Sequence, residues 1–75
     1  MTKAAFIETA IAEAKARYPW ASDADRLAKY RAALDAACTG GTGRVALDGP
    51  AVIAAWQAIG GKGKPTYKAL EALAA

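Results

Sequence analysis

Alanine makes up 22 of the 75 residues, and this one feature limits the chain to a small range of folds. Alanine has the highest helix propensity of all residues and adds little bulk to a core. Only 19 larger apolar residues remain in the hydrophobic 55% of the chain, so the core must be assembled from few side chains. A chain of this length buries only about 60% of the surface that it exposes when unfolded. Length and composition therefore predict one small all-α domain over residues 1–75.

Residue types that carry much of enzyme chemistry are missing. The sequence has no histidine and a single cysteine, Cys38, so it offers no imidazole base or metal ligand, no internal disulfide and no CxxC site. The longest uncharged run, from Gly49 to Gly61, has 13 residues and is too short to cross a bilayer. Glu8 interrupts the N-terminal apolar stretch, which argues against a cleaved signal peptide. We therefore expect a cytoplasmic, non-enzymatic protein with no cofactor, no bound metal and no membrane contact.

Two amphipathic segments joined by a short turn predict a helical hairpin in the N-terminal half. The first helix is expected over residues 3–18, because apolar residues recur on one face and Pro19 then ends it. The second helix is expected over residues 23–38. Ser22, followed three residues later by Asp25, resembles the capping box that begins a helix. A turn of this length between two such helices is typical of an αα-hairpin.

The C-terminal half contains two further helices separated by glycine-rich segments. Three glycines between 40 and 43 end the second helix. Residues 44–47 form either a loop, which we favour, or a short extended segment that would pair with a second copy and make a homodimer. Pro50 begins a third helix over 50–59, and a fourth is expected over 66–73. The predicted architecture is four short helices, a helical hairpin followed by a C-terminal helix pair.

The segment between the third and fourth helices has a concentrated positive charge. Lys62, Lys64 and Lys68 place three cations within seven residues. A Walker phosphate loop needs a serine or threonine after its lysine, and Pro65 stands there instead, which disfavours nucleotide hydrolysis. The Lys-Gly-Lys-Pro run is similar to the core of an AT-hook, although AT-hooks prefer arginine and lie in disordered tails. A glycine-rich segment with lysines also fits an ordinary solvated connector.

A larger part of this segment resembles a helix-turn-helix. The resemblance runs from Trp56 through the glycine turn into the last helix, over about 20 residues. It implies that the start of that helix enters a DNA groove while the loop lysines contact phosphates. The turn, at about six residues, is longer than the usual three or four. The candidate residues for binding double-stranded DNA are Arg44, Lys62, Lys64, Thr66, Tyr67 and Lys68.

Aromatic residues in the turn between the first two helices indicate a different function. Tyr18 and Trp20 flank Pro19, and large aromatic side chains at a turn can anchor a partner protein. Trp20 equally fits a structural role in closing the end of the hairpin. The alternative function is therefore a small adaptor or inhibitor that binds a host protein through Tyr18, Trp20 and the neighbouring helix faces.

In its size and general sequence pattern the chain resembles the compact, alanine-rich accessory proteins of bacterial viruses and prophages. The resemblance is carried by the size of the chain, by Leu47-Asp48-Gly49-Pro50 leading into Ala55-Trp56-Gln57-Ala58-Ile59, and by Gly61-Lys62-Gly63-Lys64-Pro65-Thr66-Tyr67. Members of that class with known roles bind DNA or host proteins. The resemblance implies the same two functions, DNA binding first and protein binding second, and it carries over no functional residue.

Overall fold

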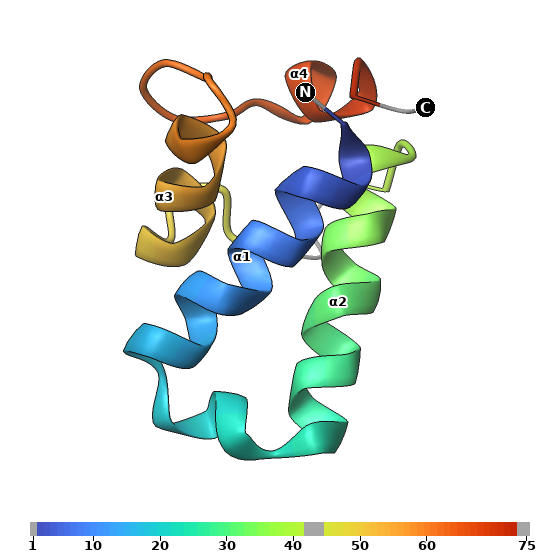
Figure 1. The fold of residues 1–75 in the computed structure, drawn as a ribbon. Coiled ribbons are helices and arrows are strands. Elements are labelled where there is room, and N and C mark those ends of the chain that lie inside the picture. The colour runs from blue at the N-terminus through green and yellow to red at the C-terminus, as the bar shows by residue number, and fades with distance from the viewer. Residues whose placement is uncertain (1, 42–44, 74–75) are drawn as a thin grey trace.

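Four α-helices and one 3-10 turn form the chain in the computed structural model, which describes residues 2–41 and 45–73 (Figure 1). In chain order these elements are α1 (Lys3–Arg17), the 3-10 turn η1 (Pro19–Ser22), α2 (Ala24–Cys38), α3 (Pro50–Ala58) and α4 (Tyr67–Glu71). The described ranges contain no β-strand, which confirms the all-α fold. Residues 45–47 form a loop rather than an extended segment, and Arg44 lies outside the described residues.

Helix α2 begins one residue later than the capping-box pattern predicts. The Asp23 carboxylate accepts hydrogen bonds from the backbone N–H groups of Asp25 and Arg26, at 2.9 and 3.2 Å. The Ser22 hydroxyl instead donates to the Pro19 carbonyl at 2.9 Å and so closes η1. Because the 3-10 turn uses the serine side chain, the next residue caps the helix, and aspartate suits that position equally well. The prediction of Ser22 as the cap was wrong by one residue.

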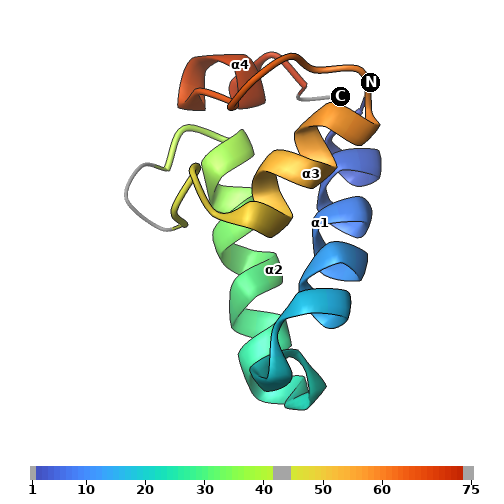
Figure 2. The same ribbon diagram turned by 90° about the vertical axis from the view of Figure 1, so that its left-hand side faces the viewer.

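Helices α1 and α2 form the predicted hairpin, with η1 at its closed end (Figure 1). The two C-terminal helices are neighbours in sequence, but they pack mainly on the hairpin: α3 lies against α1, and α4 lies against α2. A view from the side shows α3 running obliquely over the hairpin near its open end and α4 across that end (Figure 2). This arrangement leaves η1 and α4 at opposite ends of the molecule.

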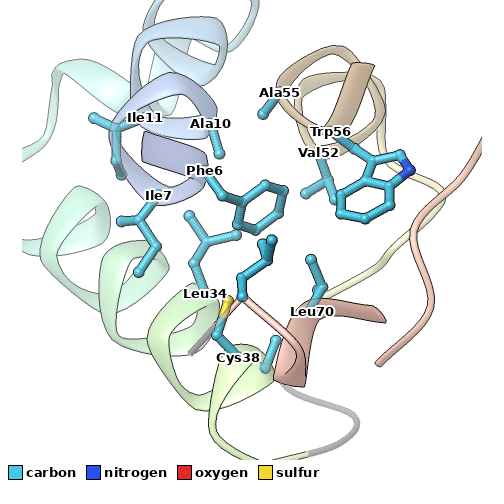
Figure 3. Close-up of a cluster of buried hydrophobic side chains, with 12 residues drawn as sticks. Phe6, Ile7, Ala10, Ile11, Leu34, Cys38, Val52, Ala55, Trp56 and Leu70 are labelled. Atoms are coloured by element: carbon cyan, nitrogen blue, oxygen red, sulfur yellow. The ribbon is translucent and has the colours of Figure 1, made fainter. Parts of the chain in front are cut away.

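The core lies where α1, α2, α3 and α4 meet (Figure 3). Its largest fully buried side chains are Phe6, Leu34, Val52, Leu70 and Cys38. A smaller cluster of three alanines joins α1, η1 and α3 near the closed end of the hairpin. Within residues 2–41 and 45–73 no polar or charged side chain is buried. The many alanines therefore let helices approach closely, while a few large residues fill the space between them.

Two ion pairs also join α1 to α2 on the surface. Lys3 Nζ lies 2.9 Å from the Asp35 carboxylate, and the Arg31 guanidinium makes two hydrogen bonds to the Glu8 carboxylate. The hydrogen bond from Arg31 lowers the pKa of Glu8. Exposed pairs of this kind contribute little to stability, so packing rather than charge holds the hairpin together. None of the described helices is both long and apolar enough to cross a membrane.

Candidate functional site

The loop between α3 and α4, residues 60–66, carries two of the predicted DNA-binding lysines and is here called the lysine loop. It follows a Schellman motif, in which Gly60 has a positive φ of 101°. The Gly60 N–H donates to the Gln57 carbonyl at 3.1 Å, and the Gly61 N–H donates to the Trp56 carbonyl at 2.8 Å. The end of α3 therefore fixes the direction in which the loop leaves the helix.

Side chains of α3 then hold the backbone of the lysine loop. The Trp56 indole N–H donates to the Lys62 carbonyl at 3.2 Å, and the Gln57 amide donates to the Gly63 carbonyl at 3.4 Å. Gly61 lies so close to the indole that a Cβ at this position would come within 2.2 Å of the ring. Trp56 thus contacts the loop at Gly61 and Lys62, and Gln57 holds the next residue, Gly63.

The lysine side chains themselves point into solvent. Lys62, Lys64 and Lys68 are all exposed. Within the described parts of the chain, none of these three lysines forms an ion pair with a carboxylate. Lys3, by contrast, is paired with Asp35. Because the lysine loop and α4 both lie at the open end of the hairpin, these three positive charges are available at one end of the molecule (Figure 1).

Thr66 and Tyr67, predicted to enter a DNA groove, both make hydrogen bonds within the protein. The Thr66 hydroxyl oxygen caps α4 by accepting a hydrogen bond from the Ala69 N–H at 3.1 Å. The Tyr67 ring is half-buried, and its hydroxyl donates to the Val45 carbonyl at 2.9 Å. Their side chains therefore help to hold α4 and the preceding loop in place, although Thr66 itself is exposed.

Helix α4 is also shorter than the 66–73 helix predicted from the sequence. It has five residues, a length of about 7.5 Å, and its Leu70 is fully buried. A recognition helix needs a longer exposed face to follow the major groove. The three lysines thus lie at one end of the molecule, where α4 has only five residues in place of the eight predicted.

At the closed end of the hairpin, three aromatic rings meet. The Tyr18 and Trp20 rings stack with centroids 5.4 Å apart and an interplanar angle of 16°. Trp20 and Tyr30 meet edge to face, with centroids 5.3 Å apart and an angle of 69°. The Tyr18 hydroxyl oxygen accepts a hydrogen bond from the Ala51 N–H at 3.3 Å, which ties this cluster to α3. Trp20 packs against the end of the hairpin, yet it remains partly exposed.

An open groove of about 360 Å³ lies beside Trp20 and is here called the aromatic groove. Its lining residues are Trp20, Arg26, Lys29, Tyr30 and Ala33. The four α2 residues follow an i, i+3, i+4, i+7 spacing, so they share one helix face. Sequence analysis missed Arg26 and Lys29, and this spacing on the helix that follows the tryptophan turn is the signal that could have found them.

The Tyr30 hydroxyl in the aromatic groove and the Cys38 thiol in the core both have a raised pKa. Burial, followed by the nearby Tyr18, raises the pKa of Tyr30 to about 12, so its hydroxyl remains protonated. Elsewhere, burial and then Asp35 raise the pKa of the Cys38 thiol, with an opposing effect from Lys3. Among residues 2–41 and 45–73 no group of three Cys, Asp or Glu side chains is arranged to hold a metal ion.

No protein-family model, no curated protein and no solved structure matches this chain. The function must therefore be argued from the geometry of its two ends.

Proposed function

We propose that the protein binds double-stranded DNA through the phosphate backbone, without reading the base sequence. Lys62, Lys64 and Lys68 are the contacting residues. The single observation that carries the proposal is the lysine loop itself, a backbone fixed by Trp56 and Gln57 that presents exposed lysines with no carboxylate partner among the described residues.

Fixing the backbone favours binding of a charged ligand. Lysine side chains lose rotamer freedom when they contact a phosphate, and a mobile loop would lose backbone freedom as well. Here the hydrogen bonds to the Lys62 and Gly63 carbonyls already order the backbone in the free protein. Binding then gains from the release of counterions that each neutralised phosphate had held.

The same geometry argues against recognition of bases. Phosphate contacts set position, whereas sequence is read by side chains that reach base edges in a groove. The Thr66 hydroxyl caps α4, the Tyr67 hydroxyl donates to the Val45 carbonyl, and α4 has only five residues with which to follow a groove. We therefore propose that the three lysines contact DNA phosphates without a helix-turn-helix.

Fluorescence anisotropy with a labelled random-sequence duplex tests this proposal. Three phosphate contacts predict that log K falls against log salt with a slope of about −2.7. Replacing Lys62 and Lys64 together by alanine should reduce the slope to about −0.9, because one contact remains. The matched control is the double variant Lys15→Ala/Arg17→Ala, which removes the same charge from the end of α1 next to η1.

Two results would contradict the proposal. One is the absence of binding at about 50 mM salt, where non-specific binding is easily detected. The other is an equal loss of slope in the control variant, which would show that net charge rather than the lysine loop determines binding. A random duplex and a set of defined duplexes should bind with the same affinity within about twofold, since each wrong base pair costs a sequence-specific protein about 1–3 kcal/mol.

A further inference from the structure

The aromatic groove has the residue types of a protein-binding site. Trp, Tyr and Arg are the residues most enriched among those that dominate binding energy at protein interfaces. In this groove Trp20, Tyr30 and Arg26 lie together on an open surface at the closed end of the hairpin. The aromatic groove is separate from the lysine loop, so it is not explained by the proposed DNA binding.

The aromatic wall of the groove is already in a fixed position. Tyr18 stacks on one face of the Trp20 ring, and Tyr30 meets the same ring edge to face. The Ala21 N–H donates to the Tyr18 carbonyl at 3.1 Å and the Asp23 N–H donates to the Trp20 carbonyl at 2.9 Å, which hold the backbone of η1. A partner therefore meets ordered rings, and little side-chain entropy is lost on binding.

The charge lining the groove is positive. Arg26 and Lys29 are exposed, and neither forms an ion pair within the described residues. The nearest carboxylates in sequence lie outside the lining: Asp23 caps α2, and Asp25 precedes Arg26 on the neighbouring helix face. An occupant with carboxylates beside an apolar side chain would complement both the cations and the rings.

We propose that the aromatic groove binds an acidic peptide segment of a partner protein. An apolar or aromatic side chain of that segment lies against Trp20 and Tyr30, and its carboxylates pair with Arg26 and Lys29. A nucleic-acid base held between two rings fits less well, because that arrangement requires two parallel ring faces. Tyr18 covers one face of Trp20, and the Tyr30 ring is inclined at 69° to it, so the rings form no parallel slot for a base.

The two indole N–H signals in a ¹⁵N–¹H NMR spectrum provide the test, because the chain has only two tryptophans. The probe is a synthetic peptide with one phenylalanine flanked by glutamates on both sides. We expect the Trp20 indole signal to shift in a saturable way, while the signal of Trp56 stays unchanged. Replacing the glutamates by glutamines, or the phenylalanine by alanine, should weaken binding by about tenfold.

The double variant Arg26→Ala/Lys29→Ala tests the protein side of the groove. Both side chains are exposed, so the variant should fold, and its peptide affinity should fall by about tenfold or more. The control Lys15→Ala/Arg17→Ala removes the same charge from residues that do not line the groove and should bind the peptide normally.

Three outcomes would overturn the inference. The first is a Trp20 indole signal that does not move at millimolar peptide. The second is a loss of peptide affinity in the control variant equal to that of Arg26→Ala/Lys29→Ala. The third is a Trp20 shift that oligothymidylate produces and the peptide does not. Failure of DNA binding at the lysine loop would leave this inference untouched, because the two experiments use different ligands and different residues.

Discussion

The two ends of the molecule present exposed side chains in different ways. At the open end, the backbone of the lysine loop is fixed by Trp56 and Gln57, while the lysine side chains are free. At the closed end, the side chains themselves are fixed, because Tyr18, Trp20 and Tyr30 pack on one another. The open end therefore offers charge without a defined shape, which suits a phosphate backbone. The closed end offers a shaped surface, which suits one particular kind of side chain.

The two tryptophans differ in the same way as the two ends of the molecule. Trp56 is 9% exposed and is part of the main core, and its indole N–H also holds the lysine loop. Trp20 packs on the small alanine cluster and on Tyr18 and Tyr30, and it keeps part of its surface in solvent. One tryptophan thus holds the lysine loop from within the core, and the other lies at the surface in the aromatic groove.

The largest expected difference between the two ends is how easily small reagents reach Cys38 at the open end and Trp20 at the closed end. Cys38 is fully buried at the end of α2 that α4 covers, and its raised pKa keeps the thiol protonated at neutral pH. A thiol reagent should therefore label native Cys38 at least about 1,000-fold more slowly than the unfolded chain, because labelling requires opening of the core. Acrylamide should quench Trp20 without such opening. Rapid labelling of native protein would show that the open end is not closed by α4.

Replacing each tryptophan by alanine should show that Trp56 contributes more to stability than Trp20. Trp56→Ala should cost about 3–5 kcal/mol of unfolding free energy, as is typical for a buried aromatic residue. Trp20→Ala should cost about 1–2 kcal/mol, because the ring is only partly buried. Urea denaturation followed by circular dichroism measures both. Equal costs would contradict the assignment of Trp56 to the core and Trp20 to the surface.

Glycine substitutions test how the lysine loop is held. Gly61→Ala should destabilise the protein by about 1–3 kcal/mol, since its Cβ would overlap the Trp56 ring. Gly63→Ala is the matched control, because a Cβ there meets nothing within 4 Å and the only cost, about 1 kcal/mol, comes from its positive φ of 63°. If the two variants have the same melting temperature, the close contact between Gly61 and Trp56 does not constrain the loop.

The smallest expected effect concerns Tyr30 at the closed end. Its folded pKa of about 12 lies above the ordinary value of 10.0, so the folded protein keeps the hydroxyl proton longer than the unfolded chain does. The contribution of Tyr30 to stability is therefore complete below pH 10 and is lost as pH rises from about 10 to about 12. Tyr30→Phe should lose less stability than the unmodified protein over this range. Parallel pH dependences would show that Tyr30 is not shielded by Trp20 and Tyr18.

Local signals in the sequence account for most of the fold. Pro19 ends α1, Pro50 begins α3, and glycines with positive φ follow α2 and α3 at Gly40 and Gly60. These residues act through their own backbone preferences, so they can be interpreted without knowing the tertiary structure. The predicted bounds of these three helices therefore agree with the structure to within one residue at each end.

Features that depend on tertiary contacts could not be predicted in the same way. Helix α4 ends early, where the Leu73 carbonyl accepts a hydrogen bond from the Lys3 N–H at 3.2 Å, a contact between the two ends of the chain. Tyr30 is spaced along α2 like the buried residues Leu34 and Ala37. It is half-buried against the core and also contacts Trp20, because η1 folds the tryptophan back onto α2. The lysines were visible as a sequence pattern, whereas the aromatic groove exists only once η1 and α2 are packed together.

Backbone NMR during titration with a random-sequence duplex at about 50 mM salt tests the central claim most directly, namely that DNA phosphates bind at the lysine loop and not at the aromatic groove. We predict that the amide signals of residues 60–64 and of Lys68 shift progressively, while the Trp20 indole signal stays in place. Shifts centred on Trp20 and Arg26, or no shifts at all at this salt concentration, would contradict the account.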